Sequence, residues 1–217
     1  MPNKEILKFI AGFRRFRARY YADEESIYRR LSQGGQSPKT MIIACSDSRV
    51  DPGMLAGASP GEIFVVRNVA NLVPPFESQG KFHGVSSAIE FAVVNLRVEN
   101  IIVLGHRQCG GIRTLMMSEN LKSTSFVAKW MQIAAPAKEK VLAANPVAFT
   151  PEQQEALCRH CELESIVISI ENLKTFPFIL EALAESRLEL HGAYFDLESG
   201  ELYELDHQTR GFQSIPL

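Results

Sequence analysis

The chain has 217 residues, of which 46% are hydrophobic and 22% charged, with a formal net charge of −2. This length suits one domain with a sizeable core, so we expect a single domain over residues 1–217, with a helical arm over 1–30 and an α/β core over 31–217. The charge excludes the basic field typical of nucleic-acid-binding proteins. No apolar run approaches the ~20 residues of a membrane span, and the first residues lack a secretory pattern, so we expect a cytoplasmic protein.

The first predicted element is an amphipathic helix over residues 4–20. Its apolar residues recur at helical spacings, and its lysines and arginines make it basic. A basic amphipathic helix can bind a membrane surface. We favour the alternative, in which the helix packs on its own domain or on a second subunit.

Short apolar runs follow, separated by helical patterns. Strand, helix and strand at this spacing indicate a parallel sheet with helices on its faces. The predicted fold is therefore α/β, with a central, mostly parallel sheet of about four parallel strands plus an antiparallel C-terminal edge strand, flanked by helices. Strands are predicted at 41–44, 63–66, 101–104 and 166–170, helices at 85–96, 113–143, 151–164 and 171–186, and a hairpin at 193–205 with Ser199 and Gly200 in its turn.

Two of these strands lead into chemically reactive segments. The first runs into Cys45-Ser46-Asp47-Ser48-Arg49, and the third runs into His106-Arg107-Gln108-Cys109-Gly110-Gly111. Ligands of parallel sheets bind beyond the carboxyl ends of the strands, so both segments are expected to face one crevice. Together they offer two thiolates, an imidazole and a carboxylate, a donor set that favours zinc.

Each of these residues alone has a simpler interpretation, because a lone buried cysteine is usually a small apolar residue. The pair Cys158 and Cys161 resembles half of a zinc site but lies in a predicted helix, without a second pair to complete it. We interpret it as structural. The two segments at the strand ends together make a metal site the favoured prediction.

These segments resemble the paired signatures of the β-class carbonic anhydrases. The resemblance rests on CSDSR (45–49) and GHRQCGG (105–111), and continues through PGEIFVVRNVANLVPP (60–75), HGVSSAIEFAV (83–93) and GAYFDLESGELY (192–203). It implies one Zn²⁺ per subunit, held by Cys45, His106 and Cys109, with an ion pair of Asp47 and Arg49 beside the metal. It also implies reversible hydration of CO2 to bicarbonate and a proton by a zinc-bound hydroxide.

By the same resemblance, the substrate pocket contains Gln36, Phe64, Val69, Phe91 and the N–H of Gly110. Many relatives carry tyrosine where this chain has Phe91, so any role of that hydroxyl is lost or moved here. The resemblance further implies a homodimer or homotetramer with active sites near the dimer interface, CO2 and bicarbonate as small-molecule partners, and neither nucleic acid nor membrane.

Two alternative functions use the same metal frame. One is a hydrolase of COS or CS2, which would differ only in the access to its pocket. The other is a non-enzymatic zinc- or bicarbonate-binding protein that has lost turnover. The intact Asp47–Arg49 pair argues against the second, because a structural zinc needs no open position.

Overall fold

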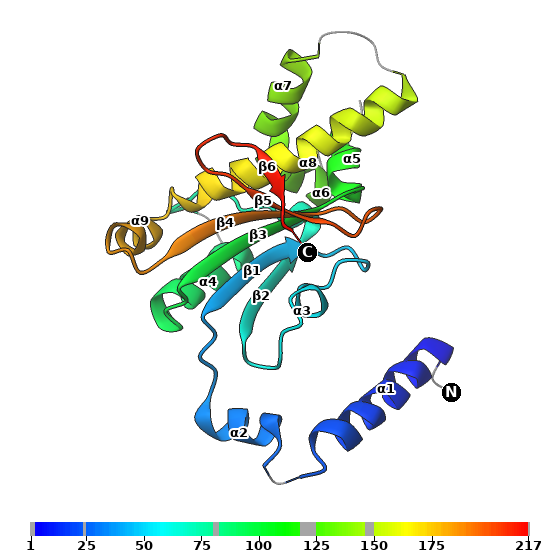
Figure 1. Ribbon diagram of the computed structural model, residues 1–217, viewed down its shortest axis with the longest axis vertical. Coiled ribbons are helices and arrows are strands. Elements are labelled where there is room, and N and C mark those ends of the chain that lie inside the picture. Colours follow the sequence, from blue (N-terminus) through cyan, green and yellow to red (C-terminus); the bar gives the residue numbers. More distant parts are fainter. Residues whose placement is uncertain (1–2, 24, 80–82, 118–124, 146–149, 217) are drawn as a thin grey trace.

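The computed structural model of the chain describes residues 3–23, 25–79, 83–117, 125–145 and 150–216. Its centre is one six-stranded sheet in the order β2-β1-β3-β4-β5-β6 (Figure 1). The first four strands in this order are parallel, and the last two are added antiparallel. The strands are β1 (Thr40–Cys45), β2 (Ile63–Asn68), β3 (Asn100–His106), β4 (Glu189–Phe195), β5 (Leu202–Leu205) and β6 (Phe212–Ser214).

Three predicted strands and the predicted hairpin are confirmed. The hairpin joins β4 to β5, with Phe195 opposite Leu202, and Gly200 supplies a left-handed φ of 75° in its turn. The antiparallel edge contains one strand more than we predicted, because β6 pairs with β5 beyond the hairpin. The mostly parallel α/β fold that the sequence predicted is therefore present.

The predicted strand over residues 166–170 is wrong. These residues lie within α8 (Pro151–Leu173), a 23-residue helix that Thr150 and Gln153 cap reciprocally at its N-terminus. Ile166 and Ile170 lie one helical turn apart, and both are buried against the sheet. A short, fully buried apolar run is compatible with either structure, so its periodicity could not decide between them. The fourth parallel strand is β4 instead.

Helices cover mainly one face of the sheet. Alternating residues of β1, β3 and β4, including Met41, Ile101 and Leu190, pack with α4 (Gly84–Glu90), α8 and α9 (Pro177–Ala184) in the largest apolar cluster. The opposite residues, including Ile42 and Leu104, form a smaller cluster on the other face with Val50, which lies two residues before α3 (Pro52–Leu55). The remaining helical elements are η1 (Val69–Asn71), the π-helical η2 (Phe91–Asn95), α5 (Gly110–Met117), α6 (Phe126–Met131), η3 (Gln132–Ala134) and α7 (Ala135–Ala143).

These helices confirm the helical predictions for the described residues of 85–96, 113–143 and 151–164; residues 118–124 lie outside the described residues. The predicted helix over 171–186 is present in part, because α8 ends at Leu173 and α9 begins at Pro177. None of the described helices has both the length and the hydropathy that crossing a bilayer requires.

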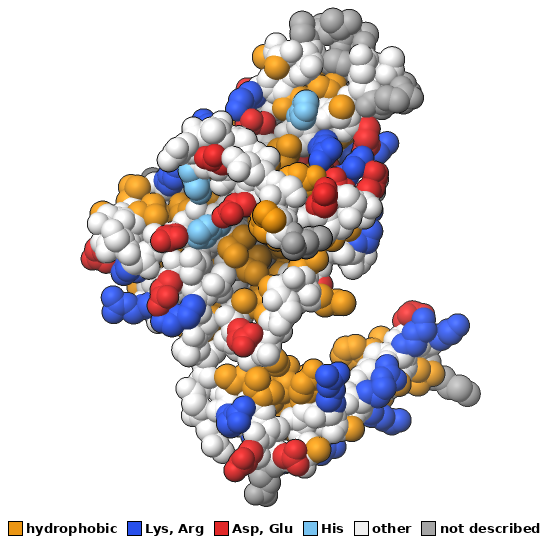
Figure 2. All heavy atoms as spheres, in the orientation of Figure 1, with side chains coloured by type: hydrophobic (Ala, Val, Ile, Leu, Met, Phe, Trp, Pro, Cys, Tyr) orange, Lys and Arg blue, Asp and Glu red, His pale blue; other side chains and the backbone are white. Residues whose placement is uncertain are grey.

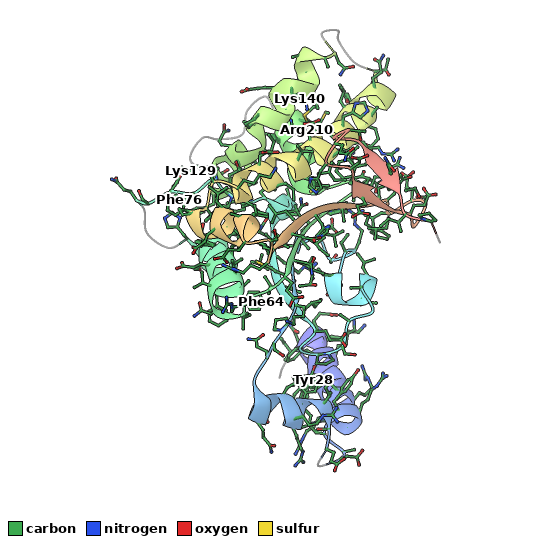
Figure 3. The ribbon with its side chains drawn as sticks, turned by 60° about the vertical axis from the view of Figure 1, so that its left-hand side comes forward. Tyr28, Phe64, Phe76, Lys129, Lys140 and Arg210 are labelled. Carbon is green, nitrogen blue, oxygen red and sulfur yellow. The ribbon has the colours of Figure 1, made fainter. Side chains whose placement is uncertain are left out.

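The N-terminal helices lie apart from the sheet (Figure 1). The predicted first helix is confirmed as α1 (Lys4–Tyr20), whose N-cap Asn3 accepts a hydrogen bond from the N–H of Ile6. It turns into α2 (Ile27–Gly34), and neither helix contains a buried residue. Aromatic contacts hold the two helices together, with the ring of Tyr28 (labelled in Figure 3) 5.0 Å from that of Phe16 and 5.7 Å from that of Tyr20.

Candidate metal centre

The centre forms where two neighbouring parallel strands end. Cys45 is the last residue of β1 and His106 is the last residue of β3, and these strands pair directly. Both side chains therefore lie at the carboxyl edge of the sheet, where parallel sheets bind their ligands.

A tight turn brings Cys109 to the same place. Gln108 adopts a left-handed φ of 59°, which reverses the chain between His106 and the start of α5. The carbonyl of Cys109 then accepts a hydrogen bond from the N–H of Arg113 at 2.9 Å, as the first bond of the helix. Gly111 lets α5 approach η1 closely, because a Cβ there would lie 2.9 Å from Val69 Cγ1.

Cys45, His106 and Cys109 present one ligand atom each, and these atoms all lie within 4.8 Å of one another. All three residues are buried. His106 Nδ1 lies 2.8 Å from the carbonyl oxygen of Arg107; since a carbonyl only accepts, Nδ1 carries the proton and donates. His106 Nε2 is then left with a lone pair, and it is buried without a hydrogen-bond partner among the described residues.

The cluster fits a zinc ion by this chemistry. Two sulfur donors and one imidazole nitrogen are the ligands that zinc prefers. A buried acceptor nitrogen without a partner is costly, and a bound metal would remove that cost. The Nδ1–H bond to a carbonyl is the usual way in which a protein orients a ligating histidine. Three protein ligands leave one position open, as in catalytic zinc sites.

When no metal is bound, the thiols of Cys45 and Cys109 differ in their pKa. A hydrogen bond from the Cys109 thiol stabilises the Cys45 thiolate and lowers the pKa of Cys45. The same bond raises the pKa of Cys109, because its proton is held by the neighbouring sulfur. Cys45 is therefore the first of the pair to ionise, and thiolate is the form that binds a metal.

Asp47 and Arg49 form the ion pair that the resemblance implied. Arg49 donates three hydrogen bonds to the carboxylate of Asp47: Nε at 2.9 Å and the backbone N–H at 2.9 Å to Oδ1, and Nη2 at 2.8 Å to Oδ2. These bonds hold the pKa of Asp47 below its usual range. Asp47 Oδ2 lies 4.0 Å from His106 Nε2, so the carboxylate borders the cluster.

Two further residues support the centre, and we did not predict either role. Arg67 donates to the carbonyls of Cys45 (2.9 Å), Asp47 (2.7 Å) and Val50 (2.7 Å), which fixes the loop after β1. Glu162 of α8 accepts a hydrogen bond from the N–H of Cys109 at 2.8 Å. Burial raises the pKa of Glu162 to about 7. In the sequence Glu162 resembles any acidic residue of a helix, so no local signal identifies it.

The expected pocket residues lie in different surroundings. The rings of Phe64 and Phe91 lie 5.9 Å apart, with Phe64 (labelled in Figure 3) beside α4. Val69 borders an apolar cavity of about 350 Å³, and its carbonyl accepts a hydrogen bond from Trp130 Nε1 at 2.7 Å. Gly110 directly follows Cys109. Gln36 is exposed on the stretch between α2 and β1.

Cys158 and Cys161 do not belong to a metal cluster of the described residues. Both lie buried within α8 as free thiols. Burial raises the pKa of Cys158 to about 11 and that of Cys161 to about 12. Both thiols therefore stay protonated near neutral pH, which agrees with a structural role.

Residues 40–202 match the family model described as carbonic anhydrase. The chain is 38% identical over 205 residues to β carbonic anhydrase 3 of Arabidopsis thaliana, covering 92% of this chain and 77% of that protein.

Solved structures give the same result. The β-carbonic anhydrase CcaA superposes with a TM-score of 0.89 at 30% identity, covering 99% of this chain and 94% of the other. A structure from Sordaria macrospora, described as one of two tetrameric β-carbonic anhydrases, gives a TM-score of 0.79 at 27% identity, with 93% and 98% of the two chains covered.

Proposed function

This chain belongs to the β-carbonic anhydrase family, whose reaction is the reversible hydration of CO2 to bicarbonate and a proton, and we propose that Asp47 and Arg49 act in that reaction beside a zinc ion. The observation that carries the proposal is the convergence of Cys45, His106 and Cys109 within 4.8 Å. When bound, zinc acts as a Lewis acid that makes water a nucleophile near neutral pH.

Asp47 is proposed to orient the nucleophile. Because Arg49 satisfies both carboxylate oxygens from one side, Asp47 is held off the metal position yet borders it. Its depressed pKa keeps it ionised at working pH, so it can only accept a hydrogen bond. A water between the metal position and Asp47 is then aimed by one fixed acceptor, which directs its lone pair toward CO2.

The substrate pocket is proposed to include Gln36, Phe64, Val69, Phe91 and Gly110. CO2 is small and apolar, so an apolar wall with few donors suits it. The paired Phe64 and Phe91 rings supply such a wall, and the N–H of Gly110 lies at the start of α5, where a helix offers free donors.

We propose a homodimer or homotetramer with active sites near the interface. Ile6, Leu7, Phe9 and Phe13 of α1 are 49–74% exposed, and Figure 2 shows hydrophobic side chains along the side of this helix that faces the sheet-bearing body, across open space. Val69 and Phe91, both proposed for the pocket, are also exposed apolar residues. A second copy would cover both surfaces.

We further propose that residues 1–30 form an arm, that residues 31–217 form the catalytic core, and that the protein is cytoplasmic. The helices α1 and α2 contain no buried residue, which supports the arm. The four cysteines are free, and unpaired thiols suit a reducing compartment.

Removal of the metal tests the function. We expect about one zinc per chain by elemental analysis, CO2 hydration that is lost after treatment with a chelator, and recovery on adding Zn²⁺. Cys45→Ser should lose both zinc and activity. Cys158→Ser, which changes a buried thiol outside the cluster, should keep both. Full activity in metal-free protein would falsify the proposal, and faster turnover of CS2 than of CO2 would reassign the substrate.

A further inference from the structure

A buried carboxylate lies behind the metal centre and takes no part in the proposed reaction. Glu162 of α8 is 3% exposed. Burying an ionisable group costs free energy unless hydrogen bonds compensate it. Its oxygens are therefore held by specific partners, and these partners indicate what the residue does.

Each oxygen of Glu162 accepts one hydrogen bond. Oε1 accepts from the backbone N–H of Cys109 at 2.8 Å, and Oε2 accepts from the hydroxyl of Tyr194 at 2.8 Å. Tyr194 is fully buried in β4, where it pairs with Gly105 of β3. One carboxylate thus joins α8, the sheet and the residue that supplies a metal ligand.

The N–H of Cys109 needs such an acceptor. Cys109 directly precedes α5, where backbone N–H groups have no acceptor within the helix. The left-handed Gln108 turns the chain at this point, and Cys109 is buried. Without Glu162, a buried donor would be left unpaired and the chain between His106 and Cys109 would lose its anchor to α8.

We propose that Glu162 is a positioning residue for zinc: it holds the backbone of Cys109 so that Sγ stays beside Cys45 and His106, and Tyr194 holds Glu162 in turn. This inference rests on the proposed metal centre. A site assembled in advance loses less ordering entropy when the ion binds, so an intact Glu162 should tighten zinc binding. Partners that orient metal ligands typically change metal affinity by about 10–100-fold.

Two conservative variants separate the length of the side chain from the chemistry of its carboxyl group. Glu162→Asp keeps the carboxyl group but withdraws it by one carbon, so it cannot span the distance to Cys109. Glu162→Gln keeps the reach and shape, and its amide oxygen can still accept from the N–H of Cys109. Glu164→Gln is the matched control, because Glu164 lies on the same helix but pairs at the surface with Lys140.

The readout is the zinc affinity of the full chain, measured by competition with a chromophoric chelator, with circular dichroism to establish folding. We expect affinity to fall about tenfold or more in Glu162→Asp and roughly threefold in Glu162→Gln, and to stay unchanged in Glu164→Gln. Wild-type affinity in Glu162→Asp overturns the inference. If only the Gln variant folds, wild-type affinity in that variant overturns it. A wild-type chain that binds no zinc overturns the metal centre itself, which is a separate failure.

Discussion

At the edge of the metal centre, the guanidinium of Arg49 fixes the orientation of the Asp47 carboxylate. Asp47 lies close enough to His106 Nε2, at 4.0 Å, for its oxygen to compete for the metal. In the reaction we propose, Arg49 would prevent this by donating to both oxygens, and its Nη2 also donates to the carbonyl of Gln108 at 3.1 Å. The loop between His106 and Cys109 therefore holds the arginine that binds Asp47.

We predict that Arg49→Ala abolishes turnover, with a loss of roughly 100-fold or more, because Asp47 is freed to occupy the open metal position. Stopped-flow CO2 hydration measures the loss, and a structure of the zinc-loaded variant shows where Asp47 lies. Arg113→Ala, which removes an exposed ion pair with Glu155, is the control and should keep its activity. Activity near that of the wild type in Arg49→Ala would contradict this role of Arg49.

Short spacings between residues were enough to predict the candidate metal-binding side chains. Cys45 and Asp47 lie two residues apart, and His106 and Cys109 lie three apart, and each pair follows a predicted strand. The contact between Glu162 and Cys109 spans 53 residues, and the bond between Arg67 and the Cys45 carbonyl spans 22. Neither contact can be predicted from the local sequence pattern. The positions of α8 and β2 relative to β1 and β3 depend on packing throughout the core.

Among the elements, the fourth parallel strand is β4 and not the predicted strand over 166–170, which belongs to α8. Residues 166–170 are rich in isoleucine and valine, which favours a strand. They lie in a helix because Thr150 starts it 16 residues earlier and one side of it faces the sheet. The true fourth strand begins with Glu189, and its alternation of exposed and buried residues was hidden next to the strong hairpin signal that follows.

The hairpin between β4 and β5 is joined to the metal-binding loop through Asp196. Its carboxylate accepts from the N–H of Glu198 at 2.9 Å and from Arg107 Nη1 at 3.2 Å. Arg159 of α8 lies 3.4 Å from the same carboxylate. Burial alone would raise the pKa of Asp196, but the Glu198 N–H and the Arg107 charge outweigh it and lower the pKa.

We predict that Asp196→Asn lowers the free energy of unfolding by about 2 kcal/mol at pH 7, because a charge-assisted acceptor is lost. A lowered folded-state pKa adds stability above the unfolded carboxyl pKa of about 3.9, and this stability is lost as the pH falls through the folded-state pKa. Denaturant unfolding from pH 7 to pH 3 should therefore show the two proteins converging in acid. Glu185→Gln, an exposed acid beside Arg187, is the control. A difference that grows in acid would contradict the argument.

At the scale of the whole molecule, the N-terminal arm is basic and the rest of the chain is acidic. The α1 segment KEILKFIAGFRRFRARY contains six lysines and arginines and one glutamate, while the whole chain has a net charge of −2. The remainder is therefore acidic, so in the assembly we propose α1 would attract the body of another copy. This attraction, together with the exposed phenylalanines of α1, favours an acidic protein partner with an apolar surface, which a second copy provides.

We predict that Phe9→Ser combined with Phe13→Ser in the full chain converts an oligomer into a monomer of 24.2 kDa. Burying two phenylalanines contributes roughly 3–6 kcal/mol per arm, so their loss should weaken association about a hundredfold or more. Sedimentation at matched concentration measures the mass, and CO2 hydration should fall with it because the assembly we propose has its active sites near the interface. The control, Lys8→Arg combined with Arg15→Lys, keeps the charge of α1 and changes side chains away from these phenylalanines, so it should remain an oligomer. A wild-type chain that sediments as a fully active monomer would refute the assembly.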